Sequence, residues 1–223
     1  MKRFLIGDSM WLVLLSGITL FFILPATKEV FTGLTSTYPF SMGFLKFAIL
    51  ATMGELLALR LASGGWKRPP GLPVRILVWG LIGIAVTFMF SFFSSGVVAM
   101  IDNGFLPSGS GILGVLLKAF YTSLLMNLTF GPVFMAAHRM SDTYIDMRAA
   151  GEKPRGAEVT AAVNWEDFVN FVVAKTIPLW WIPIHTLTFL LPAAYRVLAA
   201  AYLSIILGII LAYARRRKVK KGK

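Results

Sequence analysis

Six long apolar stretches constrain this chain more than any other feature of its sequence. They lie at roughly 8–26, 40–62, 74–101, 111–138, 168–191 and 193–214. A helix needs about 20 apolar residues to cross the hydrocarbon core of a bilayer. Only helices and closed barrels satisfy their backbone hydrogen bonds there. The sequence therefore predicts an all-α membrane protein in which a bundle of about six transmembrane helices forms one membrane domain over residues 1–223.

Composition supports this class and excludes several others. Hydrophobic residues make up 57% of the chain and charged residues 14%, whereas soluble domains are nearer half apolar and a quarter charged. The polar stretch 139–167 is too short to bury a core of its own. It is expected to be an inner-side loop with short helices, one of them capped by Asn164. Because cysteine is absent, disulfides, thiol catalysis and thiolate metal sites are excluded.

Basic residues predict the orientation of the spans. Seventeen of the 22 Lys and Arg residues fall in alternate segments, which end in a basic cytoplasmic tail at 215–223, while only Lys28 and Arg196 fall in the others. Under the positive-inside rule this asymmetry places both termini inside a plasma-type membrane. The formal net charge of +12 is therefore read as an orientation signal, with the lipid bilayer and not nucleic acid as the partner.

The arrangement of the spans leaves one question open. The last two spans meet at Pro192, which predicts a tight helical hairpin. Residues 18–30 also resemble residues 185–197. Repeated hairpins are common in membrane proteins, so three tandem helix hairpins are one possibility, and chance similarity between apolar segments is the other.

Five ionisable residues lie inside the predicted spans and are candidate pore or transport residues: Lys46, Glu55, Lys118, Lys175 and His185. Helix direction places Glu55 and Lys175 at one inner level and the other three at an outer level. The structural reading is an ion pair between Glu55 and Lys175 and snorkelling of the outer lysines. The functional reading is a cationic vestibule above a constriction, which would attract anions.

A polar stripe and a broken helix add further candidates. Ser123, Asn127, Gly131 and His138 recur on one face of the fourth span, which indicates either helix packing or a water path.

The segment 175–185 reads KTIPLWWIPIH, and each of its two prolines would free a carbonyl one turn back, at Ala174 and Leu179. Two tryptophans, Trp180 and Trp181, lie between these prolines. A packed kink and a tryptophan-gated pore wall both explain them.

Enzyme signatures are not evident. The two histidines are far apart and lack the spacing of a metal site, and no nucleotide-binding or nucleophile motif occurs. We therefore expect no catalytic residues, no metal and no cofactor.

Several short motifs resemble a known family. They are Gly54-Glu55, Met126-Asn127 with Pro132, Trp181-Ile182-Pro183, and the segment Leu191-Pro192-Ala193-Ala194-Tyr195-Arg196. The chain resembles the small integral-membrane proteins shared by peroxisomes and the mitochondrial inner membrane, as a prokaryotic-type relative. The resemblance implies a channel-like or transporter class and adds Arg196 to the candidates.

We expect a membrane channel or passive transporter for small solutes, with anions as one option. The alternative is a non-transporting scaffold or partner-binding protein, and either one could be a homo-oligomer.

Overall fold

A computed structural model describes residues 6–221 of the chain, with side chains up to residue 210. It is 86% helical, and the described residues contain no strand. The predicted all-α class is thus confirmed. Lys2, Arg3 and the side chains of the predicted basic tail, 215–223, lie outside the described part.

Among the described residues, five helices are long and apolar enough to cross a membrane. Their bounds are Ile6–Ile23 for α1, Pro39–Ser63 for α3, Leu72–Asp102 for α4, Gly111–Ala149 for α5 and, for the apolar part of α9 (Ala193–Lys221), Ala193–Ile210. These helices coincide with five of the six predicted spans. Two differences stand out: α5 continues well past residue 138, and the predicted outer loop contains α2 (Pro25–Thr37), which starts with a proline in its first turn.

The predicted span 168–191 is helical but divided. It consists of the π-helix η1 (Phe168–Trp181) and of α8 (Ile182–Leu190), and the short helix α7 (Trp165–Asp167) runs directly into η1. The short helix α6 (Gly156–Ala162) precedes this run within the predicted polar loop. No single piece of the run meets the length of a spanning helix, although the continuous run exceeds the roughly 20 residues that a span requires.

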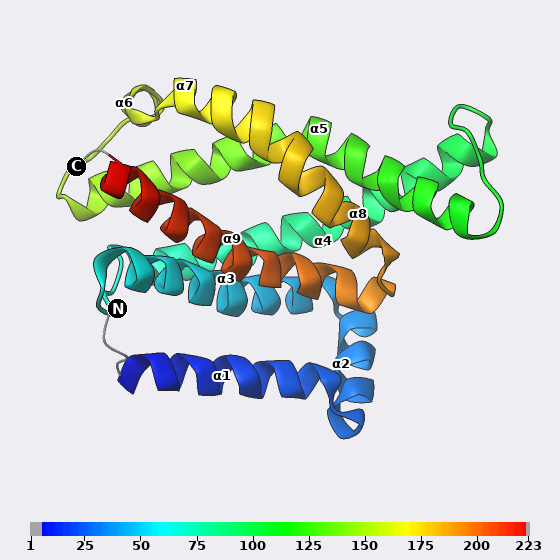
Figure 1. Cartoon of the computed structure of the whole chain (residues 1–223), viewed down its shortest axis with the longest axis horizontal. Coiled ribbons are helices and arrows are strands. Elements are labelled where there is room, and N and C mark those ends of the chain that lie inside the picture. The colour runs from blue at the N-terminus through cyan, green and yellow to red at the C-terminus, as the bar shows by residue number, and fades with distance from the viewer. Residues whose placement is uncertain (1–5, 222–223) are drawn as a thin grey trace. The chain divides into compact units, whose positions relative to one another are not determined.

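The helices group into two compact units. The first contains residues 1–84 and 201–223, and in it α1 and α3 lie side by side and are joined through α2 (Figure 1). The indole of Trp11 on α1 donates to the carbonyl of Met53 on α3 at 3.1 Å. Thr19 of α1 also hydrogen-bonds Tyr202 of α9 at 2.7 Å. These polar contacts fix helices whose outward faces are apolar.

Close packing joins α3 to the middle of α9 in the same unit. A Cβ placed on Gly54 would lie 2.9 Å from the carbonyl carbon of Ser204, and one on Gly208 would lie 2.9 Å from the carbonyl oxygen of Gly54. Small residues allow this approach of two backbones, as is usual between membrane helices.

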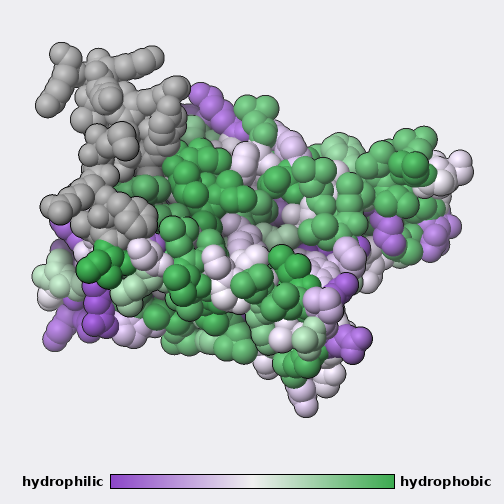
Figure 2. Space-filling view, turned by 60° about the horizontal axis from the view of Figure 1, so that its bottom comes forward, coloured by the Kyte–Doolittle hydropathy of each residue, from purple (hydrophilic) through white to green (hydrophobic). Residues whose placement is uncertain are grey.

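The second unit contains residues 85–200. In it α5 lies beside the run formed by η1 and α8, and a sharp turn after α8 leads into α9 (Figure 1). Large apolar side chains are exposed on these helices, including Leu179, Val133 and Leu187. Figure 2 shows such side chains spread widely over the visible face of the molecule. Their exposure fits helices whose outer faces contact lipid.

Candidate functional site: a polar cluster between α5 and α8

A buried polar cluster joins α5 to α8. Ser123 and Asn127 lie one helical turn apart on α5, and their exposed fractions are 0% and 3%. The Ser123 hydroxyl donates to the carbonyl of Ile182 at 2.7 Å. The Asn127 amide nitrogen donates to the carbonyl of Ser123 at 2.8 Å, and Oδ1 of Asn127 lies 3.2 Å from Nδ1 of His185. Ser123 and Asn127, two members of the predicted polar stripe, thus face α8.

The hydrogen-bond pattern assigns a tautomer to His185. Because the amide nitrogen of Asn127 is used in its bond to Ser123, its Oδ1 is the acceptor for His185. Nδ1 of the neutral ring therefore carries the proton, and Nε2 is the acceptor. The donors of Ser123, Asn127 and Nδ1 of His185 are all used within the cluster, so the group that it leaves for a small polar molecule is the acceptor Nε2 of His185.

Aromatic rings surround His185. The ring of Trp181 stacks on it at a centroid distance of 5.2 Å, and the ring of Phe90 forms a T-shaped contact with it at 5.7 Å. Phe90 also contacts Phe189, at 4.8 Å. An uncharged imidazole in an apolar shell needs its hydrogen-bond partner, and here Asn127 supplies it.

The backbone beside this cluster departs from α-helical register. The amide of Ile182 bonds to the carbonyl of Ile177, five residues back, which is the π spacing. In this register the missing amide of Pro178 frees the carbonyl of Val173 and not that of Ala174, so the predicted position of this first freed carbonyl is wrong. That prediction assumed α-helical spacing. Pro183 lies in the first turn of α8, where a missing amide costs least.

The remaining candidates of the KTIPLWWIPIH segment differ in environment. The Nε1 atom of Trp180 is enclosed and has no hydrogen-bond partner among the described residues. Lys175 is exposed on η1, the helix that precedes α8 in the sequence. Trp181 therefore contacts the cluster directly, whereas no contact of Lys175 with it is present in the described part of the chain.

Glu55 has a basic partner at the start of α4. Nη1 of Arg75 lies 2.9 Å from Oε1 of Glu55, and the indole of Trp79 donates to its other oxygen at 3.1 Å. Glu55 therefore pairs across the connection between α3 and α4, and its expected pair with Lys175, a residue of the other unit, stays a prediction. Depth along a helix gives the level of a side chain but not the direction in which it points, so it could not choose between these bases.

A second carboxylate that is bound by an arginine and a tryptophan was not predicted from the sequence. Arg60 binds both carboxylate oxygens of Asp8, at 2.8 and 2.7 Å, and the indole of Trp66 donates to the same carboxylate at 3.0 Å. Arg60 and Arg75 also bind the connection from α3 to α4. Arg60 donates to the carbonyl of Gly64 at 2.9 Å, and Arg75 donates to the carbonyl of Pro70 at 2.9 Å. The sequence signal was Asp8 itself, an acid at the start of an apolar stretch.

The structure also bears on the expected snorkelling of Lys46 and Lys118. Lys46 is 4% exposed, and its ammonium donates to Thr35 at 3.0 Å and lies 4.7 Å from the ring centre of Phe31. It therefore packs within its unit and does not snorkel. Lys118, in contrast, is exposed near the start of α5.

His138 and Arg196 have local contacts. Nε2 of His138 lies 3.8 Å from Asp142 one turn further along α5. Arg196 donates through Nε to the carbonyl of Leu191 at 2.9 Å and lies over the ring of Phe189. The proline-arginine motif at 191–196 thus stabilises the turn between α8 and α9.

Comparison with known proteins identifies no relative. No family model matches the sequence, no curated protein matches it, and no solved structure matches the fold. The resemblance to the peroxisomal and mitochondrial membrane proteins therefore stays a prediction. Within the described residues no group of acids and histidines is placed to hold a metal ion.

Proposed function

We propose that this chain is a membrane channel or passive transporter for small solutes, and that the cluster of Ser123, Asn127 and His185 lines its path. One observation carries the proposal: the cluster lies within the apolar stretches, where the helix changes from π to α register. Polar residues inside membrane helices usually mark substrate or ion pathways. Local π-helical geometry is also frequent at functional sites.

The charge pattern gives the proposed path a preference for anions. Lys118 and Lys175 are exposed cations of the second unit, and cations that line a pore attract anions. Lys46 is left out of this set because its ammonium is used in packing. His138, Trp180 and Arg196 are assigned supporting roles in the walls of the path.

The proposal includes a topology and a setting. We infer six spans with both termini inside a plasma-type membrane, so that residues 165–190 cross the bilayer despite the change of register. Three tandem hairpins, membership of the peroxisomal and mitochondrial membrane protein family, and a homo-oligomeric assembly are further parts of this proposal. We also propose that the chain has no enzymatic activity and needs no cofactor.

Flux measurements test the proposal. Purified protein in liposomes should pass small anions faster than cations of similar size. Asn127→Leu, which keeps the volume but removes the amide, should lower the flux about tenfold, the equivalent of about 1.4 kcal/mol. The matched control is Thr129→Val, an exposed position of the same helix whose hydroxyl bonds only within α5. Thermal unfolding of each variant shows that a loss of flux is not a loss of fold.

A scaffold function is the second candidate, and the two arginine clusters favour it. Glu55 and Asp8 are charges inside or beside spans, and both bind arginines in packed contacts. If wild-type protein gives no flux above empty liposomes over a range of voltage and pH, transport is ruled out and the partner-binding scaffold replaces it.

A further inference from the structure

A hollow of about 330 Å³ lies where α4 ends and α5 begins. The loop that joins these helices bends back over the first turn of α5, and glycines make this possible: a Cβ on Gly109 would lie 2.9 Å from the amide nitrogen of Gly114. The hollow lies entirely within the second unit. Its shape therefore depends on two helix ends and the loop between them.

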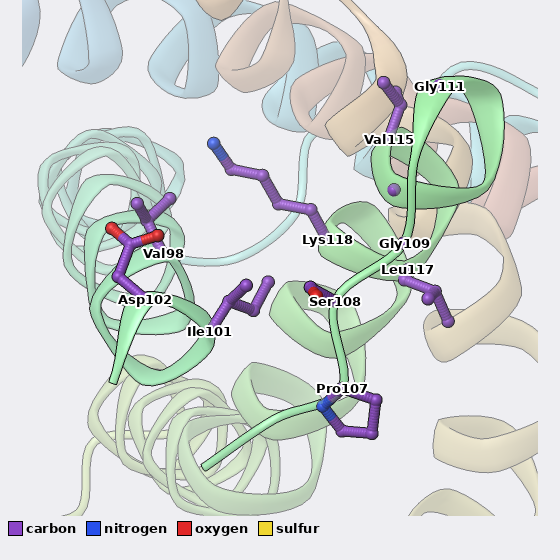
Figure 3. A pocket seen from close by; sticks show the side chains of 11 residues that line it. Val98, Ile101, Asp102, Pro107, Ser108, Gly109, Gly111, Val115, Leu117 and Lys118 are labelled. Atoms are coloured by element: carbon purple, nitrogen blue, oxygen red, sulfur yellow. The ribbon is translucent and has the colours of Figure 1, made fainter. Parts of the chain in front are cut away.

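Two opposite charges line this hollow. Asp102 comes from the last turn of α4 and Lys118 from the third turn of α5 (Figure 3). Neither side chain has a hydrogen bond or an ion pair with any described residue, and the two do not bind each other. A lining that presents an unpaired carboxylate and an unpaired ammonium is complementary to a ligand with both charges.

The rest of the lining is apolar or weakly polar. Val98 and Ile101 from α4 and Val115 from α5 contribute the apolar part, and Ser108 contributes a hydroxyl from the loop. Phe105 and Ile112 are neighbours of the lining residues in the sequence, and they are 74% and 81% exposed. Exposed large apolar residues beside the ends of helices that are long enough to span a membrane are suited to contact with lipid.

We propose that this hollow binds a ligand with a primary ammonium and a phosphate, as in an aminophospholipid headgroup. Asp102 accepts hydrogen bonds from the ammonium, Lys118 binds the phosphate, and the apolar lining contacts the start of the acyl chains. A quaternary ammonium has no hydrogen to donate, so choline lipids should bind less well. Lys118 also belongs to the proposed anion path, but no residue of the polar cluster takes part, and bound lipid is measured independently of flux.

Lipid retention by the full-length protein tests it. The protein is extracted from bilayers of phosphatidylethanolamine, phosphatidylcholine and phosphatidylglycerol with identical acyl chains, and bound lipid is counted by native mass spectrometry. We expect the ethanolamine lipid to be enriched about fivefold over the choline lipid. Asp102→Asn and Lys118→Gln should each remove the enrichment, and the exchange of both charges, Asp102→Lys with Lys118→Asp, should restore part of it. Lys153→Gln, an exposed charge in the inner loop, is the control.

The outcomes separate the sources of the ligand. If soluble phosphoethanolamine displaces the lipid, the site is supported and its ligand is water-soluble. If the lipid resists displacement, the site is supported and its ligand is the lipid. Equal retention of all three lipids would overturn the proposal. Enrichment of phosphatidylglycerol that depends on Lys118 but not on Asp102 would overturn it too, because the site would then bind anions alone. Thermal unfolding checks that each variant is folded, and both substituted side chains are exposed.

Discussion

At the scale of single residues, the first unit uses its embedded charges in contacts between helices. Arg75 and Lys46 are 6% and 4% exposed, and each has a polar partner from another segment. An uncompensated charge in such a place would cost several kcal/mol, so each partner is needed for the charge to be tolerated. Trp66 and Trp79 add one indole donor to each of the two carboxylates, and both residues are half-buried.

The pair of Glu55 and Arg75 gives a residue-scale prediction. Glu55→Gln should destabilise the protein by about 3 kcal/mol, the lower end of the range for breaking a buried pair, because the Glu55 side chain is 20% exposed. The double variant Glu55→Gln with Arg75→Gln should recover part of the loss, as measured by unfolding in detergent. Lys175→Gln combined with Glu55→Gln is the control and should show simple addition. Additive losses in the Arg75 pair would contradict this contact.

At the scale of elements, two kinds of helix contact hold the units together. In the first unit, α3 and α9 approach through backbone at Gly54 and Gly208. In the second, α5 and α8 are joined by hydrogen bonds, because Ser123 and Asn127 bind groups of the opposite helix. Packing of small residues and interhelical hydrogen bonds are the main forces between helices in lipid.

The glycine contact gives a prediction at this scale. Gly54→Ala should destabilise the protein by roughly 1–3 kcal/mol, the usual cost of overpacking, because the new Cβ would meet the backbone of Ser204. Gly33→Ala is the matched control: it is helical, and nothing lies within 4 Å of its added Cβ. That variant should gain about 0.5–1 kcal/mol from helix propensity. Equal effects at the two positions, measured by thermal unfolding, would show that α3 and α9 do not touch there.

At the scale of the whole molecule, the number of spans decides where the C-terminus lies. If residues 165–190 cross the bilayer, there are six spans and both termini lie inside. If they do not, α9 crosses from the inside, and the chain ends outside. The continuous helical run over these residues is long enough to cross, and the basic tail favours the inside.

Single-cysteine labelling separates these two topologies, since the natural chain has no cysteine. We expect a membrane-impermeant reagent applied from outside to label Ser110→Cys and Ala193→Cys in intact cells. Arg155→Cys and Lys223→Cys should react only after permeabilisation. Labelling of position 223 from outside, with protection of 193, would establish five spans instead of six.

Local sequence signals determined the class of this protein. Apolar stretches predict helices because hydropathy and length act on one segment at a time, and α3 starts and ends within a residue of its predicted bounds. The stripe on α5 was also readable, because Ser123 and Asn127 repeat with the helical period. These features need no knowledge of a neighbouring helix.

Only the tertiary structure decided which residues meet. Asp8 and Arg60 are distant in sequence, and nothing local indicates that α1 and α3 bring them together. Glu55 binds Arg75 and Asn127 binds His185 because packing sets the rotation of each helix about its axis. Sequence places a side chain at a level along its helix. The direction in which it points, and therefore the partner that it finds, depends on the helices packed around it.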